Sequence, residues 1–186
     1  MRLTRAAAWA AALLLSACAV EDPVAGPIGA IPLRNPTAPL ASQADVSAAD
    51  LSGDWAVRGL AGAGFGRADR VRLGAEGAAL LVEASVIRCS DASGLCESEM
   101  RMIPYAAAGP GRWSLGAPVP GALELPETLW VLWSDTGRRT AALGDPDGTA
   151  LLLLDREASG GGDRIAAARE ILDWYGYDLR RLEAAE

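Results

Sequence analysis

The stretch Asp50-Leu51-Ser52-Gly53-Asp54-Trp55-Ala56-Val57 decides how the rest of the chain is interpreted. Its Ser-Gly-Asp is typical of a turn, and its Trp begins a short apolar run. Gly53 allows the backbone to turn sharply or to be approached closely, and the indole of Trp55 is a large apolar group to bury. Because a Gly-x-Trp pattern fits any β-domain that starts with a buried Trp, the sequence that follows must decide the fold.

The sequence after this stretch predicts a succession of short strands. Apolar or alternating runs recur between turn signals rich in Gly, Asp and Pro, which is typical of an all-β sandwich or barrel. In residues 78–89, Leu80, Val82, Ala84 and Val86 fall on one face. The eight predicted strands cover residues 53–59, 70–73, 78–89, 96–105, 111–116, 129–135, 138–143 and 150–156.

A single helix is predicted after the strands, over about residues 163–175. Asp163 is suited to cap its first turn, and Gly176 is a natural stop. One helix after eight strands is expected to pack on the outside of the sheet. Its apolar stripe, at a spacing near 3.6 residues, consists of Ile165, Ala168, Ile171, Leu172 and Tyr175.

The chain begins with the features of an export signal. Arg2 and Arg5 precede an apolar run over residues 6–15, which is too short to span a membrane. The next four residues, Leu-Ser-Ala-Cys, resemble the bacterial lipobox, in which the chain is cut before the Cys and its thiol carries diacylglycerol. Residues 1–17 are therefore expected to be a lipoprotein signal peptide and Cys18 the lipid attachment site. The alternative is an ordinary secretory signal with a chance Cys.

Acyl chains on Cys18 would hold the protein on a membrane without a spanning segment. In bacterial lipoproteins an Asp after the Cys tends to mark inner-membrane retention, and this chain has Ala19 instead. The resemblance implies an outer-membrane protein that faces the periplasm. Residues 18–49 contain five prolines and no regular period, which predicts a flexible tether before a domain at 50–186. Residues 28–33 are the part best suited to pack on the domain instead.

Composition excludes several classes of function. The 186 residues suit one domain, and the net charge is −7. All 17 basic residues are Arg and no basic stripe is visible, which argues against a nucleic-acid partner. The absence of His removes a Ser-His-Asp triad and every His metal ligand, and the absence of Lys removes Schiff-base chemistry. No cofactor, metal or catalytic set is expected, although pairs of acidic residues would still permit acid–base chemistry.

Two cysteines flank a predicted hairpin tip. Cys89 ends the third predicted strand and Cys96 begins the fourth, so the two would face each other within reach of a disulfide. An exported chain meets oxidising conditions, and acylation of Cys18 leaves this even pair. A catalytic thiol would need a base that the sequence lacks, so a disulfide that pins the hairpin is predicted.

Three motifs together resemble the lipocalin family, in particular the bacterial outer-membrane lipocalin lipoproteins. The first is Gly53-Asp54-Trp55 on the opening strand, the second is Ser134-Asp135-Thr136 between the sixth and seventh strands, and the third is Arg156 at the end of the last strand. The resemblance is best over residues 129–182, including the Tyr-Gly-Tyr-Asp at 175–178. It implies an eight-stranded antiparallel up-and-down barrel with one C-terminal α-helix packed outside. It also implies that Arg156 lies over Trp55 at a closed floor formed with Gly53 and Asp135, as a cation–π pair.

The expected function is the binding of a small hydrophobic ligand, such as a fatty acid or lysophospholipid, in the barrel cavity, in a role in envelope lipid maintenance. Arg88 is placed either to meet an anionic head group or to lie exposed at the rim. Residues 60–128 match the family only in strand count, so ligand identity is not transferred. The predicted cavity residues are Leu80, Val82, Val86, Met100, Met102, Leu129, Val131, Trp133 and Leu152.

Two other classes remain open from the sequence. Barrel-type inhibitors of secreted proteases also begin with a Ser-Gly-x-Trp stretch, here residues 52–55, but they lack a long C-terminal helix. An envelope lipoprotein with a filled barrel and no ligand is the other alternative. The sequence does not determine the oligomeric state.

Overall fold

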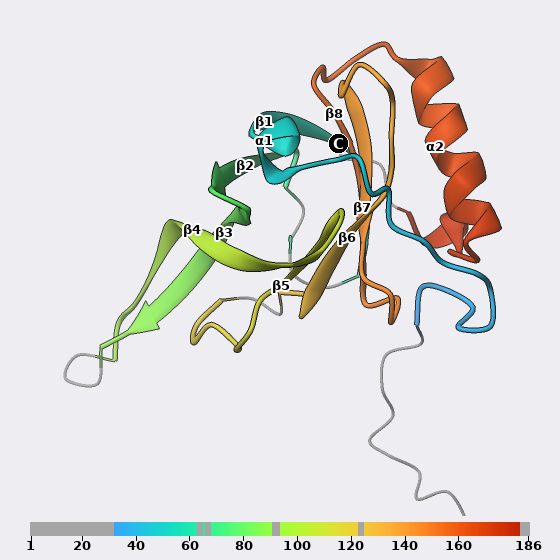
Figure 1. Cartoon of the computed structure of the whole chain (residues 1–186). Helices are drawn as coiled ribbons and strands as arrows, with labels where there is room; N and C mark the ends of the chain where they lie inside the picture. The colour runs from blue at the N-terminus through green and yellow to red at the C-terminus, as the bar shows by residue number, and fades with distance from the viewer. Residues whose placement is uncertain (1–31, 63–64, 66–67, 91–93, 123–124, 183–186) are drawn as a thin grey trace, which may run out of the picture.

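Eight antiparallel strands form a closed barrel in which each strand pairs with the next and β1 pairs with β8. Figure 1 shows this computed structural model, which describes residues 32–62, 65, 68–90, 94–122 and 125–182. The predicted all-β, eight-stranded up-and-down barrel with a C-terminal helix outside is confirmed. The elements are α1 (Ala48–Leu51), β1 (Gly53–Gly62), β2 (Arg70–Glu76), β3 (Ala79–Cys89), β4 (Cys96–Gly109), β5 (Arg112–Ser114), β6 (Thr128–Ser134), β7 (Thr140–Gly144), β8 (Ala150–Asp155), α2 (Gly162–Trp174) and the 3₁₀ helix η1 (Leu179–Arg181).

Strand β8 shows why part of the sequence reads as a continuous apolar run. Leu152 and Leu154 point into the barrel, whereas Leu151 and Leu153 belong to a second cluster outside it. That outer cluster includes Ala168 and Leu172 of α2, which cover this wall. Because both faces are buried, β8 does not need the polar alternation of a half-exposed strand.

Helix α2 begins one residue earlier than expected and is capped differently. Gly161, in the left-handed conformation, is its N-cap, and no side chain caps the first turn. The predicted cap by Asp163 is therefore wrong, and Asp163 instead places a negative charge in the first turn, where the helix dipole favours it. The helix ends at Trp174, before Gly176, which has a φ of +83°.

The segment before the barrel corrects the predicted tether. Residues 32–49 lie against the barrel, and Leu33, Val46 and Ala48 are buried. The backbone N–H of Leu33 donates to the carbonyl of Gly148 at 2.7 Å, and that of Gln43 donates to Val131 at 2.7 Å. Single apolar side chains fill separate niches here, so the segment packs without the periodicity that sequence patterns detect. Residues 1–31, including Cys18 and the rest of the predicted tether, lie outside the described residues.

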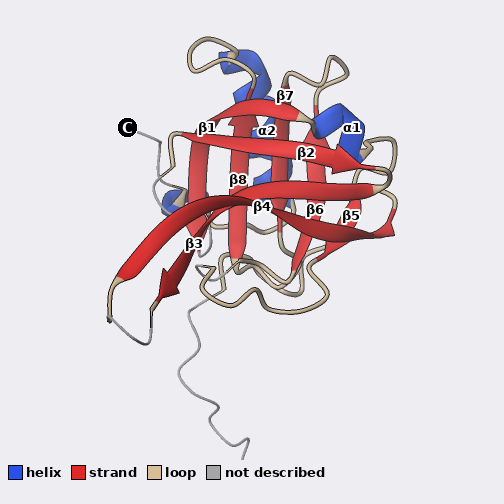
Figure 2. Cartoon of the chain, turned by 90° about the vertical axis from the view of Figure 1, so that its left-hand side faces the viewer, coloured by secondary structure: helices blue, strands red, loops and turns tan. Residues whose placement is uncertain are grey.

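The β3–β4 hairpin is longer than the barrel wall. The pairing of β2 with β3 ends at Val82, whereas the β3–β4 ladder continues to Cys89 and Cys96. The predicted disulfide between these cysteines is confirmed, with an S–S distance of 2.02 Å. Figure 2 shows the hairpin projecting from the body of the barrel. We call residues 85–90 and 94–101 the arm.

Candidate functional site

Most of the predicted cavity residues fill the barrel interior. Six of them belong to the inner core cluster, and each has at most 1% of its surface exposed. These side chains pack against one another, so the greater part of the barrel is a solid core. The six are Leu80, Val82, Val86, Leu129, Val131 and Leu152.

Two methionines assigned to the cavity lie on the outside of the barrel instead. Met100 is 61% exposed and Met102 is 37% exposed. In the β3–β4 register Val82 pairs with Ile103, so the odd-numbered residues of β4 share the inward face. In the arm those inward positions carry charged residues, and the apolar residues are on the outer face. The hydrophobic pattern therefore predicted the wrong face of β4.

Trp133 is also outside the barrel, although simple alternation places it with Leu129 and Val131. A bulge between Val131 and Trp133 shifts the register of β6 against β7. As a result Trp133 pairs with Ala142, which belongs to the outer cluster. One extra residue in a strand reverses the side on which later side chains lie.

An apolar cavity of about 190 Å³ remains near one end of the barrel. Of the predicted cavity residues, Leu152 lines its inner wall and Met100 borders its outer side. Ala84 occupies an inward position of β3, and the neighbouring inward positions hold Val or Leu, so its small side chain leaves space. The apolar residues of the lining that the sequence analysis missed are Val57, Phe65, Ala68, Val71 and Ala84.

The cavity reaches the surface between β2 and β3. Beyond Val82 these strands no longer pair, so Arg70 of β2 and residues 83–85 of β3 border an opening in the wall. Glu83 and Ser85 are on the outer face of β3, since Ala84 and Val86 are on the inner one. The opening therefore carries one positive, one negative and one hydroxyl side chain around an apolar interior.

A segment between β5 and β6 covers the same end of the barrel. Its Leu115, Val119, Ala122 and Leu125 pack against the inner cluster. The N–H of Ile87 donates to the carbonyl of Gly121 at 2.7 Å.

This contact is close enough to require glycine. A Cβ on Gly121 would lie 2.1 Å from the carbonyl oxygen of Ile87, and its φ is +78°. Further along the segment, the buried hydroxyl of Tyr105 donates to Pro126 at 2.9 Å, and burial raises the pKa of that phenol above its usual value. The segment is therefore attached both to β3 and to β4.

The opposite end of the barrel is closed by the opening motif. Trp55 is completely buried, and its indole N–H donates to the carbonyl of Leu51 at 2.6 Å. The guanidinium of Arg156 lies 3.7 Å from the centre of the Trp55 ring and donates to the carbonyls of Asp50 and Asp54. Gly53 is required here because a Cβ would lie 2.9 Å from an Arg156 nitrogen at a φ of +113°.

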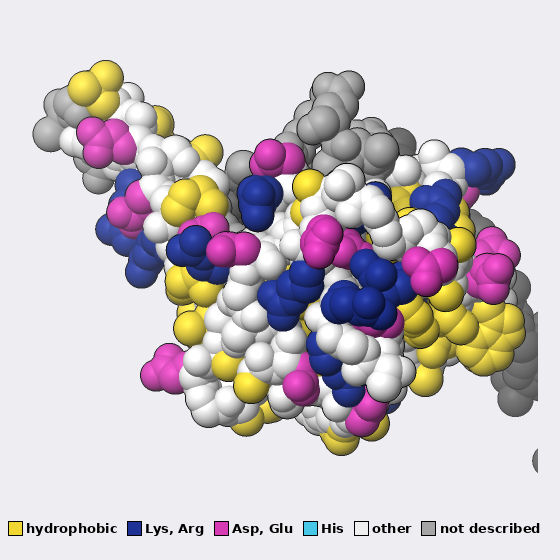
Figure 3. Space-filling model, turned by 90° about the horizontal axis from the view of Figure 1, so that it is seen from above, with side chains coloured by type: hydrophobic (Ala, Val, Ile, Leu, Met, Phe, Trp, Pro, Cys, Tyr) yellow, Lys and Arg dark blue, Asp and Glu magenta, His cyan; other side chains and the backbone are white. Residues whose placement is uncertain are grey.

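Buried carboxylates hold the turns at this closed end. Asp135 accepts the backbone N–H groups of Arg139 and Thr140 at 2.6 and 2.8 Å. Burial alone would raise the pKa of Asp135, but these bonds and the Arg139 side chain lower it below its usual value. Asp155 behaves in the same way, because burial is outweighed by hydrogen bonds from Thr140, Glu157 and Arg164. Figure 3, which looks onto this end, shows acidic and Arg side chains interspersed.

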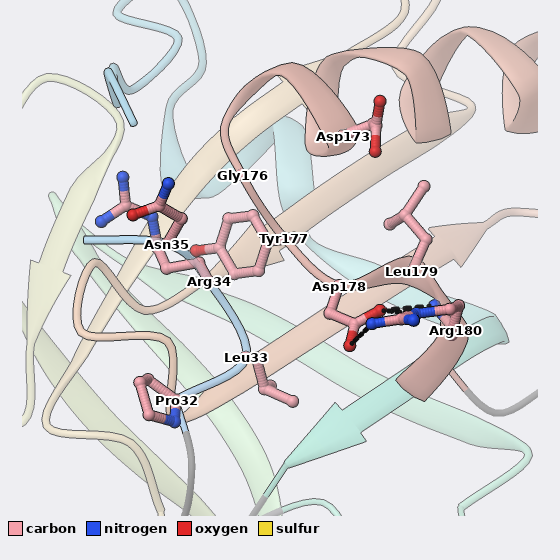
Figure 4. A pocket seen from close by; sticks show the side chains of 10 residues that line it. All are labelled: Pro32, Leu33, Arg34, Asn35, Asp173, Gly176, Tyr177, Asp178, Leu179 and Arg180. Atoms are coloured by element: carbon pink, nitrogen blue, oxygen red, sulfur yellow. Dashed lines mark hydrogen bonds and ion pairs between the residues drawn. The ribbon is translucent and has the colours of Figure 1, made fainter. Parts of the chain in front are cut away.

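A second hollow, of about 620 Å³, lies on the outer surface beside α2 and η1. Figure 4 shows that Arg180 and Asp178 face each other there, with two hydrogen bonds of 2.8 and 2.9 Å. The ring of Tyr177 backs the hollow, and its hydroxyl donates to the carbonyl of Asp145 at 2.8 Å. The Asp178–Arg180 pair and the Tyr177 hydroxyl are thus already hydrogen-bonded, and the hollow offers a ligand less apolar surface than the barrel cavity does.

Arg88 lies on the arm, where it forms an ion pair with Glu99 at 3.0 Å. It does not line the cavity between β2 and β3. Within the described residues, no group of three or more Asp, Glu or Cys side chains is arranged to hold a metal ion. In the same part of the chain, no helix has the length and hydropathy needed to cross a membrane.

Comparison with known proteins identifies the fold. No family model and no curated protein matches the sequence. Among solved structures, the solution NMR structure of lipocalin 12 from rat epididymis is similar, with a TM-score of 0.52 and 16% identity over 82% of this chain and 93% of that one. The similarity at this identity is one of fold, and the barrel with its outer helix is a lipocalin fold.

Proposed function

We propose that this lipocalin-fold barrel binds a single-chain amphiphile, of the fatty acid or lysophospholipid class, through the opening between β2 and β3. A closed eight-stranded barrel is suited in general to hold one small hydrophobic ligand. The observation that supports the proposal is the apolar cavity under Val57, Val71 and Leu152 that leads to a polar rim. An acyl chain there would be stabilised by its removal from water, at roughly 25 cal/mol per Å².

The size of the cavity selects the ligand. At about 190 Å³ it is below the roughly 300–1,000 Å³ of sites that enclose a drug-sized molecule. Much of the rest of the interior is occupied by fully buried side chains such as Leu80 and Val131. Such a space fits part of one aliphatic chain, and it is too small for the two chains of a phospholipid together.

The rim suits a head group that carries charge. Arg70 can pair with a carboxylate or phosphate, and Glu83 can pair with an amine. A zwitterionic lysophospholipid would use both residues, whereas a fatty acid would use Arg70 alone. Arg70→Ala is therefore expected to weaken the binding of both ligands, and Glu83→Gln only that of the amine-bearing one.

The lipid anchor remains part of the proposal. Acylation of Cys18 would place the barrel at the membrane from which such a ligand comes, with the outer membrane and its periplasmic face as the proposed location. The chemistry is binding and release, since the rim residues form no catalytic set that the geometry supports. Mass spectrometry of the processed N-terminus tests the anchor separately from ligand binding.

Ligand uptake by a variant that fills the cavity is the direct test. Delipidated full-length protein is titrated with a fluorescent fatty acid, using Ala84→Phe to block the cavity and Ala106→Phe as the control on an exposed position of β4. The expected result is saturable binding to the wild type and the control, with at least tenfold weaker binding to Ala84→Phe. Equal binding by a folded Ala84→Phe protein, verified by circular dichroism, would contradict the proposal.

A filled barrel without a ligand is the second candidate, because the packing of the inner core favours it. Six predicted cavity residues have at most 1% exposed surface, as a purely structural core would. This alternative predicts that the wild type takes up neither the fluorescent probe nor a lysophospholipid.

A further inference from the structure

Three features of the molecule lie at the same end of the barrel. The cavity opens there, the arm projects there, and the described chain starts there at Pro32. The β7–β8 turn, which the first described residues contact, also belongs to this end, because β8 runs from Ala150 here to Asp155 at the closed end. Figure 1 shows the arm and the start of the described chain both directed away from α1.

The position of the first described residues is fixed. The side chain of Arg34 is buried, and it donates to the carbonyls of Tyr175, Pro146 and Ala38 at 3.3, 3.0 and 2.7 Å. Leu33 accepts a hydrogen bond from Asp178 at 2.7 Å in addition to the one that it donates to Gly148. The first described residues are therefore held at a defined point beside the β7–β8 turn.

The arm presents apolar side chains to solvent at this end. Leu95 near the tip is 69% exposed and Ile87 is 40% exposed, on the same arm as Met100. Large side chains of this kind cost free energy in water, and groups of them mark interaction surfaces. The disulfide between Cys89 and Cys96 holds the two strands of the arm together.

The charges of the arm nearly balance one another. Arg88 pairs with Glu99 at 3.0 Å, and Arg101 lies 3.6 Å from the same carboxylate. With Glu97 the two strands of the arm carry two positive and two negative side chains, and the sequence between them adds Asp91, whereas the whole chain has a net charge of −7. The arm can therefore approach an anionic surface that would repel much of the remaining molecule.

We infer that the apolar side chains of the arm, Ile87 and Met100 on its outer face and Leu95 near its tip, rest on the surface of a phospholipid bilayer and turn the cavity opening toward it. The inference rests on the proposed anchor at Cys18. Pro32 is fourteen positions after Cys18, so the anchor holds Pro32 within about 50 Å of the bilayer, at 3.3–3.6 Å per residue. The closed end, with its Arg72–Asp54 and Arg138–Asp45 pairs, faces the aqueous phase.

Site-specific cross-linking on vesicles tests this orientation. Full-length acylated protein is reconstituted into vesicles of phosphatidylethanolamine and phosphatidylglycerol, with a photoreactive benzoylphenylalanine at Leu95, at Ile87 or, as the matched control, at exposed Glu76 near the closed end. The expected result is at least fivefold more lipid adduct at positions 95 and 87 than at position 76. Equal yields at the three positions, or adducts to a second copy of the chain instead of lipid, overturn the inference.

The failures of the two proposals can be distinguished. Protein that stays on the vesicles without lipid adducts at position 95 overturns the contact by the arm and leaves the anchor in place. Protein that is not retained by the vesicles overturns both the anchor and the orientation, while binding of the fluorescent fatty acid in solution still reports on the cavity.

A kinetic measurement tests the consequence for ligand transfer. Leu95→Glu should slow the transfer of a fluorescent fatty acid from vesicles to the protein at least fivefold, without changing its affinity in solution. Ala106→Glu, on the exposed face of β4 away from the arm, is the control and should not change the transfer rate. An unchanged rate for Leu95→Glu contradicts the inference.

Discussion

Trp55 is held at the closed end of the barrel by contacts from α1 and from the residue that follows β8. Its N–H bonds to Leu51 in α1, and Arg156 from the end of β8 covers its ring at 3.7 Å. Trp55→Ala is expected to lower the free energy of unfolding by about 3–5 kcal/mol, as truncation of a buried aromatic does. Arg156→Gln should cost about 1–2 kcal/mol, since it removes a partly desolvated cation–π contact. Urea denaturation measures both values, and an unchanged midpoint for Trp55→Ala would contradict this account of the closed end.

Asp145 and Asp155 are buried carboxylates whose pKa values shift in opposite directions. Burial raises the pKa of Asp145, although the N–H groups of Asp147 and Thr149 oppose this effect. The charged form is thus disfavoured in the folded state, and Asp145 destabilises the protein at neutral pH relative to a neutral side chain. Asp145→Asn keeps an oxygen to accept both N–H groups. It is therefore expected to increase the free energy of unfolding at pH 7.

The pH dependence separates these two residues. The gain from Asp145→Asn should shrink as the pH falls through the raised pKa and vanish below the ordinary value of 3.8. Asp155→Asn should destabilise the protein at pH 7, because the lowered pKa of Asp155 shows that its charged form stabilises the folded state. That stabilisation is present above pH 3.8 and is lost as the pH falls through the pKa that Asp155 has in the folded protein. Chemical denaturation at a series of pH values gives both curves. The same sign for both variants at pH 7 would refute the assignment.

At the scale of elements, the arm depends on its disulfide more than the barrel does. The bridge closes a short loop, with Cys89 and Cys96 seven positions apart, so chain entropy limits its contribution to about 2.5 kcal/mol. Replacing both cysteines by Ser should speed hydrogen exchange at least tenfold in residues 85–90 and 94–101. Exchange in β6, β7 and β8 should stay unchanged, because the arm extends beyond the barrel wall. Acceleration of exchange throughout the barrel would show instead that the arm stabilises the whole fold.

The strands were predictable from the sequence because their signal is local. Turn residues and period-two alternation place every predicted strand over an observed one, and the helix is shifted by only one residue. The alternation of apolar and polar residues does not show which face of a strand points into the barrel once the strand extends beyond the wall or contains a bulge. The pattern therefore predicts Met102 and Trp133 in the cavity wrongly, because the apolar residues of this part of β4 lie on its outer face and the β6 bulge shifts the alternation. Met100 also lies on the outer face of β4, but it borders the cavity from that side. The packing of residues 32–49 could not be predicted from a local pattern either, because the surfaces that bury these side chains are formed by strands distant in sequence.

At the scale of the whole molecule, ligand binding should appear as added stability. A ligand that binds only the folded protein stabilises it by about 2.7 kcal/mol at one hundred times its Kd. A saturating lysophospholipid should therefore raise the melting temperature measurably, whereas a dispersed two-chain phospholipid should not, given the cavity of about 190 Å³. Calorimetry on the delipidated protein compares the two. A larger shift with the two-chain lipid would contradict the single-chain proposal.

The site was less predictable than the fold. The resemblance carried by Gly53, Trp55 and Arg156 predicts a barrel with a closed end, but it does not say where the interior stays empty. That depends on Ala84, whose small side chain interrupts the large residues of β3, and on the point at which β2 separates from β3. The alanine is a signal that the sequence offers, whereas the separation of the strands arises only in three dimensions.

The pairing of β1 with β8 also affects how the chain reaches its folded state. This pairing joins Ala56 to Asp155, nearly a hundred residues later, so the ring of strands cannot close until the whole β region is available. Contacts this distant in sequence form slowly, on a scale of milliseconds to seconds for all-β domains. Until then β1 presents an unpaired edge along which other chains can add. Aggregation is therefore most favoured during the stage of folding before β8 pairs with β1. A chaperone that protects this chain would bind the unpaired edge of β1.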